Sequence, residues 1–249
     1  MNIVIFTGGY APKAELTVDF FKTHKPDFVI SADSGLETFE TYSEFFNSLP
    51  EKLFLSEPNL ILGDWDSLSQ KSILKKYPSQ IIENFNVDKD YTDTELALER
   101  AHEKLGTISK NNKADSDMII LVGAGGGSRI DHLLAVFDLF STDLKPDVWL
   151  SGEQFLYFLP KESSVKIFDL KNDDIVSVLR LSNSRAGGKV CSNGLEWEGG
   201  LFRSEGVPSL SNRISKEYFL KNLPVSIKTL ESDFVLVLPY SARLEWESF

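Results

Sequence analysis

The sequence predicts two joined domains: an α/β domain whose parallel sheet has helices on both faces, then an all-β domain of the β-sandwich type. In the first 150 residues, short apolar runs alternate with helical patterns. The run Met118–Val122 is apolar at every position, as expected of a strand buried on both faces. From about residue 160, short strand-like runs between turn residues replace this alternation. We therefore predict an α/β domain over residues 1–160 and a β-sandwich over residues 161–249.

The elements of the first domain follow from apolar periodicity. The predicted strands are Ile3–Thr7, Phe28–Ser31, Leu60–Gly63, Gln80–Asn84, Met118–Val122 and Val148–Leu150. The predicted helices lie near residues 14–23, 36–46, 69–76, 93–105 and 129–140. The helix near residue 93 has the clearest start signal, because Thr92 and Glu95 have the spacing of a capping box.

The second domain is predicted from apolar runs that are too short for helices and are separated by turn residues. These runs are Val165–Phe168, Ile175–Leu181, Lys189–Ser192, Gly200–Arg203, Leu210–Ile214, Val225–Thr229 and Phe234–Pro239. Turns are expected at Asn183–Gly188 and at Ser232-Asp233. No long helical pattern occurs in this half, so a small sandwich or barrel is favoured.

Composition argues against several classes of protein. The chain has 249 residues and a formal charge of −11 without a basic cluster, so no nucleic acid partner is expected. No stretch has the roughly 20 apolar residues that cross a membrane. The N-terminal Met1–Gly9 fits a first strand rather than a signal peptide. Cys191 is the only cysteine, which fits a reducing compartment. We expect a cytoplasmic protein with no membrane partner.

Glycine and acidic residues follow five of the predicted strands. These segments are Gly8-Gly9, Asp33–Gly35, Gly63–Ser67, Asp88–Asp93 and Gly123–His132. In open parallel sheets, ligands bind at the carboxyl ends of the strands. We therefore expect one shared site at that edge of the sheet.

Three aspartates of this edge are candidates for metal and phosphate chemistry. Asp64 and Asp66, two residues apart after an apolar strand, could share a hydrated Mg²⁺. The alternative for this pair is a surface turn. Asp93 could serve only the start of its helix, as a negative charge near the N-terminus. Because Asp88 and Asp90 add further charge to the same loop, metal binding or substrate orientation is the favoured interpretation.

The Gly123–Gly127 loop leads into the helix near Arg129 and is a candidate phosphate site. Arg129 can donate two parallel hydrogen bonds to a phosphate. A capping box formed by Ser128 and Asp131 is the structural alternative. The loop is neither a Walker A motif nor a strict dinucleotide-binding fingerprint.

Two histidines lie outside this edge, and one lies within it. His24 and His102 fall on predicted helix surfaces, where we expect them to be solvated. His132 adjoins Asp131, so contact with a ligand and exposure to solvent are equally favoured there. No spacing of His and Cys indicates a zinc site, and no Gly-x-Ser-x-Gly motif indicates acyl transfer.

The order of these motifs resembles the thiamine pyrophosphokinase family. The matching segments are Gly63–Ser67, Asp88–Leu98, Gly126–His132, Ser192–Trp197 and Ser209–Asn212. The resemblance runs from Gly8 to about Asn212 and therefore covers both predicted domains. Trp65 stands where the family usually has Phe, and the glycine loop ends Gly-Gly-Gly-Ser-Arg where Gly-Gly-Arg is typical.

The resemblance implies transfer of the pyrophosphoryl group of ATP to the hydroxyl of thiamine, giving thiamine diphosphate and AMP. It also implies Mg²⁺ as cofactor, ATP as co-substrate, and a homodimer with the active site at the subunit interface. In this interpretation Asp64, Asp66 and Asp93 are catalytic, and Asp64 and Asp66 hold the metal. The residues assigned to ATP are Gly8, Gly9, Asp33, Ser34, Ser67, Arg129, Asp131 and His132. Those assigned to thiamine are Lys89, Trp197, Ser211 and Asn212.

Other functions stay open from the sequence. A pyrophosphokinase acting on another alcohol, such as a hydroxymethylpterin, would not need the segment Gly194–Trp197. A non-catalytic nucleotide-binding module would not need the clustered acids. A metal-dependent phosphohydrolase would release phosphate without an acceptor. For Trp197, the alternative to a thiamine contact is a core position in the sandwich.

Overall fold

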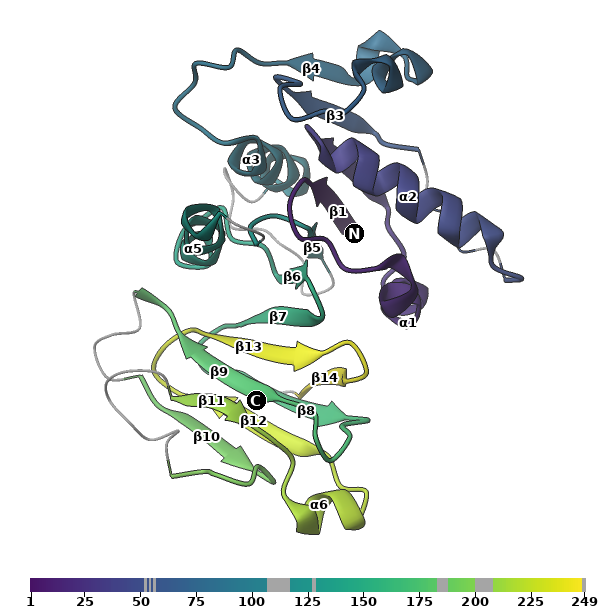
Figure 1. The fold of residues 1–249 in the computed structure, drawn as a ribbon. Helices are drawn as coiled ribbons and strands as arrows, with labels where there is room; N and C mark the ends of the chain where they lie inside the picture. The colour runs from purple at the N-terminus through teal and green to yellow at the C-terminus, as the bar shows by residue number, and fades with distance from the viewer. Residues whose placement is uncertain are drawn as a thin grey trace. The chain divides into compact units, whose positions relative to one another are not determined.

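The computed structural model describes residues 1–51, 53, 55, 57–106, 117–126, 129–182, 188–199 and 208–247. The chain divides into two compact units, Met1–Gly152 and Glu153–Phe249 (Figure 1). The first unit is a parallel sheet with helices, and the second is built from antiparallel strands, which confirms the predicted fold class. No helix in the described ranges is long and apolar enough to span a bilayer.

The sheet of the first unit is parallel throughout. Its strands are β1 (Asn2–Thr7), β2 (Phe28–Ala32), β3 (Leu60–Gly63), β4 (Ile82–Asn84), β5 (Met118–Val122) and β6 (Val148–Ser151). They are arranged in the order β6-β5-β1-β2-β3-β4. Residues Ile3–Phe6 and Ile119–Val122 are completely buried, which explains why these runs are apolar without alternation.

Helices cover both faces of this sheet. Helices α1 (Val18–Thr23) and α2 (Gly35–Ser48) lie on one side of the strands, and α3 (Asp93–Leu105) and α5 (Ile130–Leu139) lie on the other (Figure 1). Right-handed crossovers give this arrangement when the strand order reverses direction, as it does here at β1. The reversal places a ligand-binding crevice at the carboxyl ends of β1 and its neighbours.

Helix α3 begins as its capping box predicts. Glu95 N donates to Thr92 Oγ1 over 3.2 Å, and Thr92 N donates to Glu95 Oε2 over 2.8 Å. The helix ends at Gly106, which adopts a φ of 71°. Contrary to the expectation of solvated side chains, His102 is buried, with its Nε2 3.0 Å from the carbonyl oxygen of Lys145, and His24 is half-buried and stacks on the ring of Phe20.

In the described part of the chain, three 3₁₀ segments lie in the first unit, and two of them change the predicted elements. They are η1 (Ala14–Thr17), η2 (Lys71–Lys76) and η3 (Ser79–Ile81). The helix expected near residues 69–76 is therefore η2, in which no residue is buried, so no packed face supports a longer α-helix. The strand expected from Gln80 begins at Ile82, because η3 includes Gln80.

The second unit contains two antiparallel groups of strands. They are β11-β9-β13-β7 and β10-β12-β8-β14. Their bounds are β7 (Gln154–Leu159), β8 (Ser164–Phe168), β9 (Val176–Arg180), β10 (Val190–Asn193), β11 (Ser209–Asn212), β12 (Val225–Thr229), β13 (Phe234–Pro239) and β14 (Arg243–Glu247). A short helix, α6, spans Lys216–Leu220. Strands β7 and β14 are additions to the predicted set, and β7 lies before the predicted division at residue 160. The strand expected at Gly200–Arg203 and most of the turn at Asn183–Gly188 lie outside the described residues.

Candidate active site

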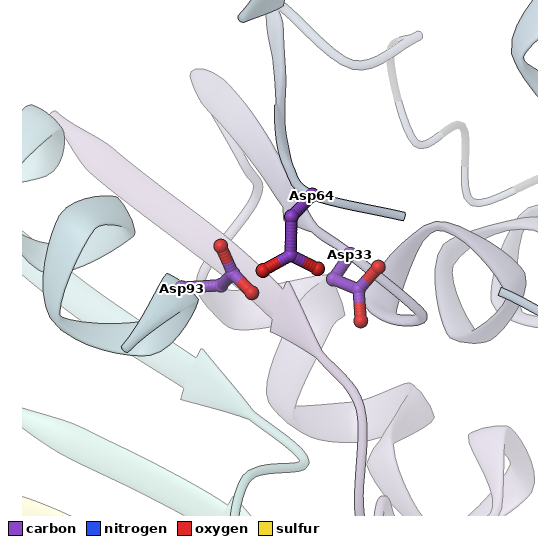
Figure 2. A group of neighbouring side chains, drawn as sticks. All are labelled: Asp33, Asp64 and Asp93. Atoms are coloured by element: carbon purple, nitrogen blue, oxygen red, sulfur yellow. The ribbon is translucent and has the colours of Figure 1, made fainter. Parts of the chain in front are cut away.

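Three aspartates meet at the carboxyl edge of the parallel sheet (Figure 2). Asp33 follows β2, Asp64 follows β3, and Asp93 is the first residue of α3. One carboxylate oxygen from each lies within 4.8 Å of the other two. Figure 2 shows Asp64 between Asp33 and Asp93. Within the described ranges, this is the one group of acidic, His or Cys side chains placed to share a metal ion.

Two oxygens of this aspartate cluster lack the partners that buried acceptors normally have. Asp33 is 7% exposed, and its Oδ1 accepts no hydrogen bond from the described part of the chain. The same holds for Asp93 Oδ1. A set of three carboxylates with unsatisfied oxygens suits a hard divalent cation such as Mg²⁺. The donor set therefore fits the cofactor that the motifs predict.

Lys89 places its ammonium group among these carboxylates. Its Nζ lies 2.5 Å from Asp64 Oδ2 and 3.3 Å from Asp93 Oδ1. The first contact is a hydrogen bond, whereas the second is an ion pair without hydrogen-bond geometry. The side chains of Asp64, Lys89 and Asp93 are 7%, 15% and 20% exposed, so the ion pairs are largely shielded from water.

The surroundings move the pKa values of two cluster members in opposite directions. Burial raises the pKa of Asp93, and the charges of Asp64 and Asp33 act in the same direction, while Lys89 opposes them. Burial also acts upward on Asp64, but hydrogen bonds from Lys89 and from the N–H of Asp66 prevail and lower its pKa. Such a separation gives two neighbouring carboxylates different acid–base roles.

The loop after β3 directs Asp64 and Asp66 differently. Trp65, between them, adopts a φ of 64° and buries its ring, and its Nε1 donates to Asn84 Oδ1 over 2.6 Å. Asp66 is exposed and accepts a hydrogen bond from Ser67 Oγ. Its N–H donates to Asp64 Oδ1 over 3.2 Å. The cluster therefore contains Asp33 in addition to Asp64, and the metal role of Asp66 stays a prediction.

The predicted nucleotide residues Gly8, Gly9 and Ser34 lie where loops approach closely. A Cβ on Gly8 would lie 2.2 Å from Ser34 Oγ. Gly9 has a φ of 98°, and a Cβ there would lie 2.6 Å from the carbonyl oxygen of Gly125. Ala124 N donates to Gly8 O over 2.7 Å, which ties the loop after β5 to the loop after β1. Only glycine permits this approach of backbone to backbone.

The predicted residues Arg129, Asp131 and His132 lie at the start of α5 and are exposed. Arg129 Nη2 donates to Asp131 Oδ2 over 2.7 Å, and Arg129 Nε donates to Asp131 Oδ1 over 2.9 Å. These hydrogen bonds hold the pKa of Asp131 far below its usual range. An arriving phosphate would therefore compete with Asp131 for the Arg129 guanidinium. Gly127 and Ser128, which form the end of the glycine loop, lie outside the described residues.

In the second unit, the predicted thiamine residues form a connected local group. Trp197 is 55% exposed, which rules out the alternative of a core position in the sandwich. The guanidinium of Arg213 lies 5.1 Å from its ring centroid. Asn212 is buried and contacts the backbone of Trp197 at both N and O. Ser211 is exposed with a φ of 55°, and its N–H donates to Ser177 Oγ.

Sequence reasoning missed two residues of this group. Glu198 Oε1 accepts hydrogen bonds from Gly194 N and Ser192 Oγ, at 2.9 Å and 3.2 Å, and thereby fixes the loop that carries Trp197. Arg213, which contacts the indole ring, directly follows the motif that ends at Asn212. Its position next to that motif is the one feature of the sequence that could have indicated Arg213.

Comparison with known proteins gives one family. The family described as thiamin pyrophosphokinase, catalytic domain, matches residues 22–149. This range includes all three aspartates of the cluster and Lys89, whereas Gly8, Gly9 and the residues around Trp197 lie outside it. A search of curated proteins found no match to the chain.

Several solved structures share the fold. Thiamine pyrophosphokinase from Bacillus subtilis superposes with a TM-score of 0.65 and 16% identity, covering 96% of this chain and 99% of its own. Thiamin pyrophosphokinase from Candida albicans gives 0.63 and 18%, with coverages of 96% and 88%. Yeast thiamin pyrophosphokinase gives 0.62 and 17%, with coverages of 96% and 86%. At these identities the likeness establishes the fold across both units.

Proposed function

The chain belongs to the thiamin pyrophosphokinase family, and on that premise we propose that it transfers the pyrophosphoryl group of ATP to the hydroxyl of thiamine. The products are thiamine diphosphate and AMP. The observation that carries this proposal is the cluster of Asp33, Asp64 and Asp93, which lies at the carboxyl edge of the sheet within the matched range, with Lys89 paired to Asp64 and Asp93. Clustered carboxylates with a nearby ammonium suit the binding of phosphates together with a metal ion.

Asp33, Asp64 and Asp93 are the residues that would hold Mg²⁺, with Asp66 as the further ligand predicted from the sequence. Bound there, the metal would neutralise charge on the phosphates of ATP. Asp33 Oδ1 accepts no hydrogen bond from the described residues, and Asp93 Oδ1 has only the ion pair with Lys89; both support this assignment, because a buried acceptor is stabilised by a cation. Asp66 is exposed and lies beside Asp64, to which its N–H donates, so it is kept as a proposed further ligand of the metal.

Asp93 is the proposed group that orients the thiamine hydroxyl and accepts its proton. The hydroxyl oxygen forms a bond to the β-phosphorus while the bond from that phosphorus to the oxygen bridging it to the α-phosphate breaks. AMP leaves with the bridging oxygen, and the hydroxyl proton passes to the Asp93 carboxylate. The position of Asp93 beside Asp64 in the cluster supports this role, because a base must lie within hydrogen-bond reach of the proton that it accepts.

ATP is proposed to bind along the loops after β1, β2 and β5. Gly8 and Gly9 let the loop after β1 approach Ser34 and the loop after β5 closely, and Ser34 precedes α2, whose first N–H groups attract anions. Ser67 lies beside Asp66, at the metal side of the site. Arg129 supplies a forked donor for phosphate when Asp131 releases it, and Asp131 and His132 remain available to the nucleotide.

Thiamine is proposed to stack on Trp197, with Lys89 and Ser211 as further contacts. The indole is 55% exposed, and its contact with the guanidinium of Arg213 is of the cation–π kind that a cationic thiazolium ring could also make. Asn212 is buried beneath the loop and acts by holding the backbone of Trp197. It is therefore proposed as a positioning residue rather than a direct contact.

A homodimer with its active site at the subunit interface is part of this proposal. Two apolar side chains of α5, Ile130 and Leu134, are 68% and 61% exposed. Apolar side chains exposed together on one helix support a partner surface. The dimer would bring the thiamine residues of one subunit to the catalytic centre of the other.

An assay of AMP release across several alcohols tests the proposed function. The protein is incubated with ATP and Mg²⁺, either alone, with thiamine, or with a hydroxymethylpterin. We expect AMP to form with thiamine, and little AMP or free phosphate to form without it. AMP formed equally with the pterin would identify a different acceptor, and free phosphate formed without any acceptor would identify a hydrolase.

A further inference from the structure

Lys89 occupies a position that a metal ion would need. Its ammonium lies 2.5 Å from Asp64 and 3.3 Å from Asp93, two members of the aspartate cluster. A cation held by the same carboxylates cannot approach them while the ammonium remains between them, because like charges at such distances repel strongly. Lysine has a flexible four-carbon side chain, so the ammonium can leave without movement of the fold.

The charges of the cluster indicate when a metal ion could replace the ammonium of Lys89: when a nucleotide binds at the same time. Three carboxylates and one ammonium leave an excess of negative charge, and Asp33 Oδ1 lacks a hydrogen-bond donor among the described residues. A divalent cation would compensate this excess better than Lys89 does. A displaced Lys89, however, needs a new anionic partner, and a bound nucleotide brings its phosphates to this edge of the sheet.

We propose that Lys89 is the exchangeable counter-ion of the aspartate cluster, and that it couples metal binding to nucleotide binding. In the metal-free protein, Lys89 holds the carboxylates together and competes with a free cation for them. When metal and nucleotide arrive together, the cation takes the carboxylates and Lys89 turns to the phosphates. This inference rests on the metal site of the proposed function, and it gives Lys89 a role toward the cluster in addition to its proposed contact with thiamine.

Mn²⁺ binding to the whole protein tests the exchange, with the fraction of free Mn²⁺ followed by its paramagnetic resonance signal. The variant Lys89→Met removes the charge and keeps the length of the side chain. The matched control is Lys76→Met, which removes a positive charge of the same unit that pairs with Glu40, outside the cluster. Each protein is titrated alone and with α,β-methylene-ATP, in which the scissile bond is blocked.

Without nucleotide, Lys89→Met is expected to bind Mn²⁺ about tenfold tighter than the unsubstituted protein, because a competing cation is gone. Lys76→Met is expected to bind it with unchanged affinity. The nucleotide analogue should tighten Mn²⁺ binding to the unsubstituted protein and should do so less in Lys89→Met, since coupling between two ligands is lost when the coupling group is removed.

Equal or weaker Mn²⁺ binding by Lys89→Met, without nucleotide, would overturn the exchange. Lys89→Gln provides the same test with a polar side chain if the Met variant folds poorly. A variant that folds only when Mn²⁺ is present would support the exchange, because the metal then replaces the missing ammonium. Normal AMP release with unchanged Mn²⁺ affinity would remove this inference alone. Tightened Mn²⁺ binding by Lys89→Met, together with no AMP release by the unsubstituted protein, would instead remove the proposed function.

Discussion

Asn212 holds Trp197 by both of its backbone groups: Asn212 Nδ2 donates to Trp197 O over 2.6 Å, and Trp197 N donates to Asn212 Oδ1 over 3.2 Å. The amide is buried, while the indole that it positions is 55% exposed. A large aromatic side chain fixed at its backbone and open to solvent at its ring is suited to stacking on a ligand.

Replacing Trp197 should therefore impair acceptor binding and leave stability nearly unchanged. We expect Trp197→Ala to raise the thiamine KM by the equivalent of about 1–3 kcal/mol, with little change in the KM for ATP. Trp197→Phe should raise the thiamine KM less, because a smaller aromatic face remains. Steady-state kinetics and thermal melting of the same samples check both parts. A large loss of stability with an unaltered thiamine KM would contradict the assignment.

Asn212→Ala should behave differently, because Asn212 is buried and acts through Trp197. Its loss leaves the N–H and carbonyl of Trp197 without those partners, which should cost about 1–3 kcal/mol of unfolding free energy. We also expect a higher thiamine KM, since the indole is no longer fixed. Denaturant unfolding and kinetics measure the two effects. A variant with lowered stability and a normal thiamine KM would show that Asn212 is structural only.

Asp64→Asn should weaken Mn²⁺ binding more than Asp66→Asn. Asp64 lies inside the aspartate cluster, whereas Asp66 is exposed and accepts a hydrogen bond from Ser67. Loss of one charged ligand from the cluster is expected to lower the affinity for Mn²⁺ by about tenfold or more. Titrations with Mn²⁺ give the order directly. An equal or larger loss in Asp66→Asn would restore the Asp64–Asp66 pair as the principal metal site.

Gly9→Ala should destabilise the first unit and weaken ATP binding. Its φ of 98° disfavours a side chain, and the added Cβ would lie 2.6 Å from Gly125 O. Gly106→Ala is the matched control, because Gly106 also has a positive φ of 71° but nothing lies within 4 Å of its Cβ position. We expect about 1 kcal/mol of destabilisation at Gly106 and more at Gly9. Equal losses of stability would show that contact with Gly125 is unimportant.

His24 should make the first unit sensitive to mild acid. Burial beside Phe20 lowers the pKa of His24 below its ordinary value of 6.5, although a hydrogen bond to Phe20 O opposes this. The unfolded chain therefore binds the proton more readily, so this contribution to stability is full above pH 6.5 and is lost as pH falls through the lower, folded value. The difference in unfolding free energy between the unsubstituted protein and His24→Gln should therefore shrink as the pH falls from about 7.5 to about 5. A difference independent of pH would contradict this.

The sequence predicted the buried elements better than the exposed ones. The bounds of β3 and β5 match the prediction because both are nearly continuous apolar runs between turn residues. The strand β14 was missed, since Arg243–Glu247 is mostly exposed and alternates charged with apolar side chains at an edge of its sheet. The burial of His102 was missed because a helical pattern does not reveal which face meets the sheet.

The predicted strands placed the site at the carboxyl edge of the parallel sheet, but they did not show which side chains contact one another there. The chain pattern placed Asp33, Asp64 and Asp93 after successive strands, and their approach depends on the parallel order of β2 and β3. The different environments of Asp64 and Asp66 depend on the positive φ of Trp65, which no spacing of residues encodes. The position of Lys89 among the carboxylates likewise depends on the fold of an irregular loop.

The fate of the two outer phosphates of ATP tests pyrophosphoryl transfer most directly. The protein is incubated with Mg²⁺, thiamine and ATP labelled with ³²P at the β-phosphate in one sample and at the γ-phosphate in another. We expect both labels to appear in thiamine diphosphate in equal amounts, with one AMP formed for each product molecule, and Asp93→Asn to suppress both. Label from the γ-position alone, accompanied by ADP, or label found only in free phosphate would contradict pyrophosphoryl transfer at this site.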